Sequence, residues 1–381
     1  MTAARTKRPA IAPEGQGVTF IELFFDLVFV FAITQVTGLV AHHLTLGGVL
    51  QGVLVFWMIW WGWTQFTWAL NPADTNHGLV RLGTLLATAV AFPMALGVGD
   101  AFGEAGLLFV IPYVLIRLIG LVLYVWVTSE HADQQKAVRS FAALSILGLI
   151  AAVAGGFASP EHRLWFWGGT IVLDFIAAGI AGNREVWGLH IPHFAERHGL
   201  IVIIALGESL IVAGNGAVSQ ELTPTLFNIS IAAVVLTCIM WWTYFGWLKD
   251  ALEHAFEKQT EKQGAFGRDV YSLLHFPMIV GIIALAVSVE EMVAHPNDPL
   301  HTETLIIFVA GIALFVGAAA VAHWRASGEV LITRFICLAL LAGATWLHHH
   351  APILWILGGG IVALLVIVLV EARFHRAEAG D

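Results

Sequence analysis

Charged side chains inside apolar segments are the residues of this 381-residue chain that could do chemistry. Glu22 and Asp26 are four residues apart, so they share one face of a predicted helix. Arg117, Asp174 and Glu208 lie inside three other apolar runs. An ionised group at the centre of a membrane helix costs about 2.5 to 3.5 kcal/mol on insertion scales, so each needs a partner or a water-filled cavity. We predict that the arginine pairs with one carboxylate while another takes up a proton or a cation. The alternative is a structural ion pair that locks the helices together.

A second group of polar residues opens the apolar run near 196–217. His193 and Glu196 share a helical face at a spacing that could hold a metal ion. A two-histidine zinc helix has its histidines four residues apart, whereas His193 and His198 are five apart. The ligand set is therefore incomplete, and the competing interpretation is that Glu196 and Arg197 cap the helix and pair at the inner membrane surface.

Two prolines mark helix breaks that could lie near a binding site. Pro93 and Pro277 stand in the related tripeptides Phe-Pro-Met of the third and ninth apolar runs. Each proline removes an amide and frees a carbonyl oxygen. Matched breaks in two halves of a chain point to the substrate site of a transporter. A packing kink inherited through duplication explains them equally well.

The elements that must position these residues are membrane helices. The composition is 58% hydrophobic and only 12% charged, which excludes an ordinary water-soluble globule. We predict an all-α polytopic membrane protein of about 12 spans. Trp57, Trp61 and Trp68 fall on one face of the second span and are interpreted as a lipid-facing or interfacial belt. The spans lie near 18–41, 48–70, 79–100, 106–129, 140–158, 163–182, 196–217, 225–248, 269–292, 303–323, 331–349 and 353–372.

Basic residues orient these spans. If the chain crosses the membrane at every predicted span, 16 of its 18 Lys and Arg fall on one side. The exceptions are Arg117, which is inside a span, and Arg163, which falls on the other side. Lys and Arg concentrate on the cytoplasmic side of membrane proteins. The sequence therefore predicts that both termini are cytoplasmic.

Short patterns recur in the same order in the two parts of the chain, which indicates an internal duplication. The matches pair Phe20–Glu22 with Phe194–Glu196, Trp60–Trp61 with Trp241–Trp242, the two proline tripeptides, and Leu164–Val172 with Leu354–Val362. An even number of spans in each half gives the halves the same orientation, as in parallel-repeat transporters. A long basic loop from Lys249 to Arg268 is predicted within the second half. The predicted parts are a basic tail at 1–17, a first six-helix repeat at 18–182, a linker at 183–193, a second six-helix repeat at 194–374 and a tail at 375–381.

Several function classes find no support in the sequence. It shows no phosphate-binding glycine loop, serine elbow or zinc-protease helix, which argues against an ATP-driven pump. We expect no cofactor and no nucleic acid. The expected partners are the lipid bilayer and a small solute or an ion, protons included, and a homo-oligomer is left open.

Two motifs resemble those of a known family. They read Glu22-Leu-Phe-Phe-Asp26-Leu-Val-Phe-Val-Phe-Ala-Ile-Thr-Gln35 and His193-Phe-x-Glu196-Arg197-x-Gly199-Leu200-x-x-Ile203-Ile204-x-Leu206-Gly207-Glu208. Both resemble the low temperature requirement protein A family of bacterial membrane proteins, over nearly the whole chain. The resemblance implies a location in the bacterial cytoplasmic membrane. It singles out positions without giving a role to any of them, namely Glu22, Asp26, Gln35, Glu196, Arg197, Gly207 and Glu208.

The main hypothesis is a secondary transporter, or an ion- or proton-coupled carrier, whose substrate the sequence does not identify and whose site lies between the two repeats. The alternative is a membrane-embedded enzyme or lipid-handling protein in which His193, Glu196 and His198 act with Asp26 in acid–base or metal chemistry. A membrane sensor or assembly partner is the third hypothesis. The residues assigned to the carrier site are Glu22, Asp26, Gln35, Arg117, Asp174, Glu196, Arg197 and Glu208, with Pro93 and Pro277 as the helix breaks near it.

Overall fold

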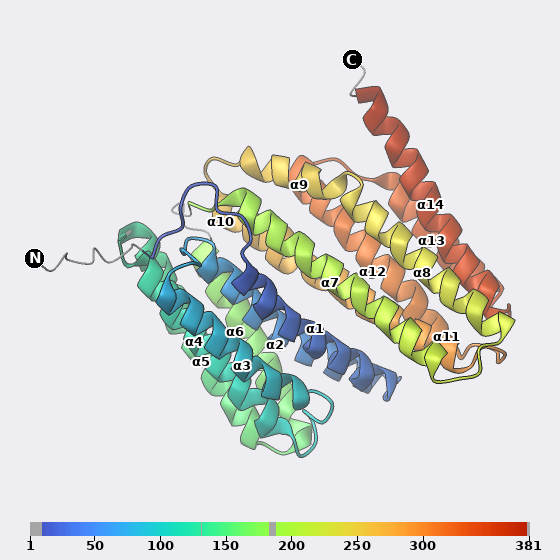
Figure 1. Cartoon of the computed structure of the whole chain (residues 1–381), viewed down its shortest axis with the longest axis horizontal. Helices are drawn as coiled ribbons and strands as arrows, with labels where there is room; N and C mark the ends of the chain where they lie inside the picture. The colour runs from blue at the N-terminus through green and yellow to red at the C-terminus, as the bar shows by residue number, and fades with distance from the viewer. Residues whose placement is uncertain (1–9, 131, 183–187, 379–381) are drawn as a thin grey trace, which may run out of the picture. The chain divides into compact units, whose positions relative to one another are not determined.

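The computed structural model describes residues 10–130, 132–182 and 188–378 (Figure 1). The ends of the predicted tails at 1–9 and 379–381, and the linker residues 183–187, lie outside the described residues. Within the described ranges the chain is helical, apart from its connections and one isolated bridge between Ile11 and Ala73. The predicted all-α membrane class is confirmed.

Eleven helices in the described ranges are long and apolar enough to cross a membrane. The twelfth predicted span corresponds to α13 (Ile332–Leu347), which has 16 residues. A helix of that length rises about 24 Å, which is shorter than a hydrocarbon core of about 30 Å. The eleven are α1 (Phe20–Ala41), α2 (Leu46–Leu70), α3 (Gly78–Leu96), α4 (Gly106–Val127), α5 (Ala132–Phe157), α6 (Pro160–Gly182), α7 (Ile191–Val218), α8 (Pro224–Phe245), α11 (His275–Ala294), α12 (Thr302–Ser327) and α14 (Ile353–Glu378).

The segment predicted as a long basic loop is mostly helical. It holds α9 (Leu248–Glu257), α10 (Gln263–Phe266) and the start of η2 (Gly267–Leu273), a π-helical turn that runs directly into α11. Leu248, Leu252 and Phe256 are buried along one side of α9, while its other positions are largely charged. This i, i+4, i+8 stripe defines an amphipathic helix, so the loop prediction was wrong.

The described chain forms two compact units, each treated by itself. Unit 1 consists of Met1–Gln35, Leu54–Arg197 and Gln259–Arg268, and unit 2 consists of Val36–Val53, His198–Lys258 and Asp269–Asp381. In unit 1, α4 packs along α3 and α5, and α5 packs along α6 (Figure 1). In unit 2, α11 packs along α12, and α8 packs along α14. The predicted duplication, with its repeat boundaries, stays a prediction.

Aromatic side chains of α2 form much of the interior of unit 1. Trp57 and Trp61 are buried and stack on each other with ring centroids 5.3 Å apart. Phe175 of α6 stacks on Trp57 at 4.7 Å. A lipid-facing belt was therefore the wrong interpretation of these two tryptophans, because their rings fill the contact between α2 and α6.

Candidate functional site

Glu22 lies in the first turn of α1, buried and fully hydrogen-bonded. Its Oε2 accepts from the backbone N and the Oγ1 of Thr19, at 3.0 and 2.9 Å, which is a capping-box arrangement. Its Oε1 accepts from Nη1 of Arg197 at 3.0 Å and lies 3.0 Å from Nε2 of His193. An ionised carboxylate offers about four acceptor positions, so every position on Glu22 is used.

Asp26 follows one turn later on the same face of α1 and is completely buried. Its Oδ1 accepts from Nη2 of Arg197 at 2.5 Å and from the indole Nε1 of Trp63 at 2.8 Å. Among the described residues, its Oδ2 has no hydrogen-bond partner. The guanidinium of Arg197 therefore bridges two carboxylates, and its centre also lies 5.6 Å from the centroid of the Trp63 ring.

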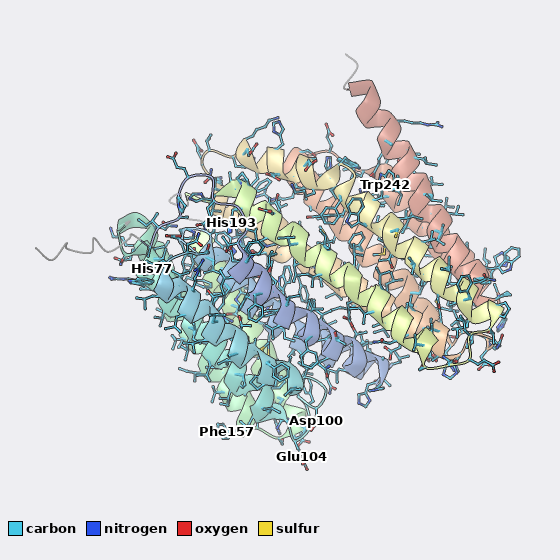
Figure 2. All side chains as sticks on the ribbon, viewed as in Figure 1. His77, Asp100, Glu104, Phe157, His193 and Trp242 are labelled. Atoms are coloured by element: carbon cyan, nitrogen blue, oxygen red, sulfur yellow. The ribbon has the colours of Figure 1, made fainter. Side chains whose placement is uncertain are left out.

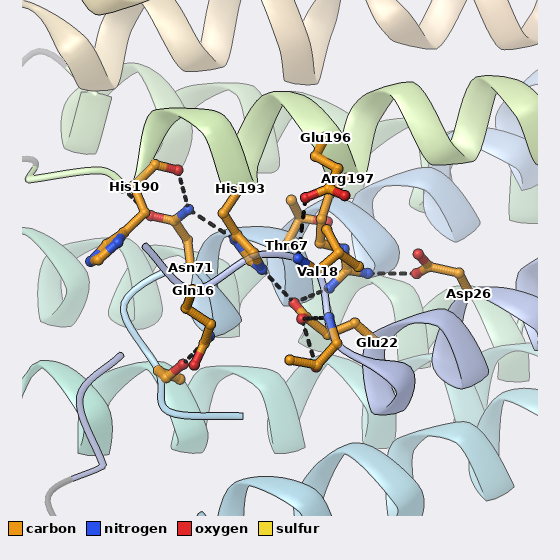
Figure 3. Close-up of polar contacts among 12 residues, drawn as sticks. Gln16, Val18, Glu22, Asp26, Thr67, Asn71, His190, His193, Glu196 and Arg197 are labelled. Atoms are coloured by element: carbon orange, nitrogen blue, oxygen red, sulfur yellow. Dashed lines mark hydrogen bonds and ion pairs between the residues drawn. The ribbon is translucent and has the colours of Figure 1, made fainter. Parts of the chain in front are cut away.

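The first turns of α7 supply the other side of this network. His193 and Arg197 are four residues apart, so they face α1 together. Nδ2 of Asn71, at the end of α2, lies 3.2 Å from Nδ1 of His193. Figure 3 shows the resulting row of contacts from Asn71 through His193, Glu22 and Arg197 to Asp26. We call Glu22, Asp26, His193 and Arg197, with Asn71 and Trp63, the Glu22–Arg197 network.

The network lies at one end of unit 1. His193 is at the same end of this unit as His77, whereas Asp100, Glu104 and Phe157 lie at the other end (Figure 2). His190, which precedes α7, exchanges two hydrogen bonds with the Asn71 side chain. Burial lowers the pKa of His190 below its ordinary value.

A second buried network ties α2, α4 and α6 together in unit 1. The Arg117 guanidinium binds Asp174 in a bidentate pair, with Nη1 to Oδ2 at 3.1 Å and Nη2 to Oδ1 at 2.9 Å. Its Nη1 also donates to the Tyr113 hydroxyl at 2.5 Å, and its Nε donates to Oε1 of Gln65. One positive and one negative charge meet here, so the pair is electrically balanced, and each nitrogen of the guanidinium donates a hydrogen bond.

The helix α2 contributes one residue to each network, Trp63 to the first and Gln65 to the second. Residues two positions apart on an α-helix point about 200° apart. Trp63 donates to Asp26 of the first network, while Nε2 of Gln65 donates to the Arg117 carbonyl oxygen at 2.7 Å. Gln65 could have been identified from the sequence, because it is a polar residue within the apolar run of α2.

Unit 2 holds a buried ion pair that the sequence analysis missed. Arg334 of α13 donates through Nε and Nη2 to the carboxylate of Glu371 on α14, at 2.7 and 2.8 Å. Its Nη2 also donates to the Thr243 carbonyl oxygen at 3.0 Å. Trp247 donates to the same carboxylate at 2.9 Å. Both charged residues stand near predicted span ends; Arg334 was used only as a topology signal, and Glu371 was not singled out.

The remaining predicted site residues have separate surroundings. Gln35 is half-buried on α1. Glu196 is exposed and accepts from the backbone N of Val18 at 3.2 Å. Glu208 is buried on the part of α7 that belongs to unit 2. Pro93 lies in the last turn of α3, whereas Pro277 lies in the first turn of α11 after the π-helical turn.

The three residues considered for a metal ion do not converge. His193 contacts Glu22, Glu196 is exposed, and the ring of His198 lies 5.2 and 5.4 Å from those of Tyr271 and His275 in unit 2. Five residues on a helix separate His193 and His198 by about 140°. Among the described residues no group of three His, Cys, Asp or Glu side chains could hold a metal ion.

Comparisons with known proteins agree with the two motifs at the starts of α1 and α7. The family described as bacterial low temperature requirement A protein (LtrA) matches residues 17–370. An uncharacterized protein of Rhizobium meliloti (strain 1021) is 32% identical over 295 residues, which is 73% of this chain and 70% of that protein. No solved structure matches the chain significantly. Because the family match spans the helices and the Glu22–Arg197 network alike, this chain is a member of the bacterial LtrA family of membrane proteins.

Proposed function

We propose that the protein is a secondary carrier that couples the movement of a small solute to a proton, with the Glu22–Arg197 network as the coupling site. The observation that carries the proposal is that two buried carboxylates share one guanidinium. With His193 neutral, the ionisable groups of the network bear one positive and two negative charges. An unbalanced charge removed from water is unfavourable, so the buried network favours binding of one proton.

This unbalanced charge suits a carrier that alternates between two states. When the network is closed off from water, the bound proton keeps it neutral. When water reaches the network, hydration stabilises the ionised carboxylate, so the proton can leave. A solute that binds one of these states better shifts the equilibrium between them, which links its movement to that of the proton.

The balanced Arg117–Asp174 pair has a different part in this proposal. Its charges cancel and its contacts join α2, α4 and α6. Breaking such a pair leaves an uncompensated buried charge in either state. The pair therefore keeps unit 1 rigid, while the Glu22–Arg197 network changes its protonation.

The proposal also includes an orientation. Both termini are cytoplasmic if the excess of Lys and Arg follows the usual rule. Because Glu22 lies in the first turn of α1, the network is then near the cytoplasmic face of the inner membrane. Protons would enter and leave it by a short path on that side and a longer path on the other.

A flux assay with the full chain in proteoliposomes tests this proposal. A pH-sensitive dye is trapped inside, the outside is acidified, and solutes are added by class: amino acids, sugars, organic acids and monovalent cations. We expect one class to accelerate proton entry beyond that in protein-free liposomes. The acceleration should disappear in Asp26→Asn, because an amide cannot carry the proton.

The matched control is Glu161→Gln, the same chemical change at an exposed carboxylate of unit 1. It should leave the acceleration intact. The proposal is wrong if no solute class moves protons faster than empty liposomes do, or if Asp26→Asn retains the full acceleration. Equal incorporation of each variant is checked by the amount of protein recovered from the vesicles.

A further inference from the structure

Backbone contacts of His190 fix the orientation of the Asn71 side-chain amide. The backbone N of His190 must donate, and it lies 3.0 Å from Oδ1 of Asn71. The carbonyl oxygen of His190 must accept, and it lies 2.9 Å from Nδ2. A flipped amide would lose both hydrogen bonds, so the NH2 group of Asn71 is the part that faces His193.

The Asn71 orientation decides the protonation state of His193. Nδ2 of Asn71 can only donate a hydrogen bond to Nδ1 of His193, so Nδ1 must be an unprotonated acceptor. The ring proton is then on Nε2, which donates to Oε1 of Glu22 at 3.0 Å. A doubly protonated imidazolium would set an N–H against an NH2 group. His193 is therefore held as the neutral tautomer.

The two carboxylates differ in whether an acceptor position is left for a proton. Glu22 accepts from Thr19 twice, from His193 and from Arg197, so all its acceptor positions are filled. Asp26 accepts twice through Oδ1, and its buried Oδ2 accepts from no described residue. Protonating Glu22 would displace a donor, whereas protonating Oδ2 of Asp26 displaces none. A neutral hydroxyl also costs less to bury than an unpaired charged oxygen.

We infer that Oδ2 of Asp26 is the atom that binds the proton, and that Asn71 is a positioning residue that keeps His193 from taking it. The charged groups that face Asp26 are Arg197 from α7 and Glu22 from α1, while α2 contributes the indole of Trp63. The role of this proton in transport rests on the proposed function. Its location does not, because it follows from hydrogen bonds alone.

Infrared spectroscopy of the full chain in lipid membranes locates the proton without any transport. A protonated carboxylic acid gives a carbonyl band separate from that of a carboxylate. We expect this band at neutral pH in the wild type, shifted when the aspartate carboxyl carbons are isotopically labelled and unshifted when the glutamate carbons are. It should disappear in Asp26→Asn and persist in Glu22→Gln and in the control Asp174→Asn.

The isotope labels keep the inference testable even if a variant fails to fold, because they need only the wild type. A band that shifts with glutamate labelling, a band that survives Asp26→Asn, or no acid band at neutral pH would each overturn the assignment to Asp26. If the band belongs to Asp26 but no solute drives proton flux, the proton site holds and the carrier proposal fails.

Asn71 is tested by NMR of protein with nitrogen-labelled histidine. The signal of His193, identified by its loss in His193→Gln, should be that of a neutral ring with the proton on Nε2. In Asn71→Asp the side chain presents an acceptor to Nδ1, so we expect a fully protonated His193 and a weaker acid band of Asp26. A protonated His193 in the wild type, or an unchanged His193 signal in Asn71→Asp, would contradict the role given to Asn71.

Discussion

Replacing the two carboxyl groups of the network by amides should have very different effects on stability. In Asp26→Asn the amide oxygen can still accept from Trp63 and Arg197, and the new NH2 group replaces an oxygen that accepts no hydrogen bond from any described residue. In Glu22→Gln the NH2 group must face either the two donors of Thr19 or those of His193 and Arg197. Two hydrogen bonds of Glu22 are then lost.

The magnitudes follow from these counts. A hydrogen bond to a charged group contributes about 1.5 to 3 kcal/mol, so the loss of two in Glu22→Gln should lower the free energy of unfolding by about 3 to 6 kcal/mol. Asp26→Asn replaces a carboxyl group that already carries the proton, so the guanidinium keeps its pair with Glu22 and the network stays electrically balanced. We expect a change within about 1 kcal/mol.

The assay is reversible unfolding in mixed micelles, followed by tryptophan fluorescence at neutral pH. Wild type, Asp26→Asn and Glu22→Gln are compared at equal detergent composition, with Glu161→Gln as the surface control. If Asp26→Asn is destabilised as much as Glu22→Gln, the two carboxylates are equivalent and the argument from their hydrogen bonds is refuted.

Three further predictions concern the scaffold. Arg117→Met should lower the unfolding free energy by about 3 to 5 kcal/mol because it leaves Asp174 unpaired, and adding Asp174→Val should restore most of that loss in the same unfolding assay. Gly281→Ala should lower the melting temperature because the added Cβ would lie 2.6 Å from the carbonyl oxygen of Gly311, whereas Gly343→Ala, with open space around its Cβ position, should leave it nearly unchanged. Reporter domains fused to each terminus should both be active only in the cytoplasm, and an extracytoplasmic signal from either would contradict the orientation.

Much of the fold could be predicted from the sequence because the bilayer restricts the answer. Long apolar runs can only be helices there, so the positions of the spans were predicted, with ends that differ from those of the helices by up to eight residues. The helix α9 was missed because its apolar stripe of Leu248, Leu252 and Phe256 is short and lies among charges. Trp57 and Trp61 of α2 were misjudged because aromatic residues are common both in interfacial belts and in interiors.

The candidate site was only partly predictable. The four-residue spacing of Glu22 and Asp26 put both carboxylates on one helical face, and the structure agrees. Their basic partner could not be identified from the sequence. Arg197 lies near a span end, where an arginine can either mark the cytoplasmic side or form a buried ion pair. Asn71 gave no signal, since its importance comes from the backbone of His190, which is far away in the sequence.

The number of protons moved with each solute molecule tests the central claim most directly. Once the solute class is known, it is obtained from the membrane potential that just stops net flux in proteoliposomes at a set pH gradient. One unpaired carboxylate charge in the network predicts one proton per cycle in the wild type and none in Asp26→Asn. A ratio of two or more, or the same ratio in both proteins, would contradict the account.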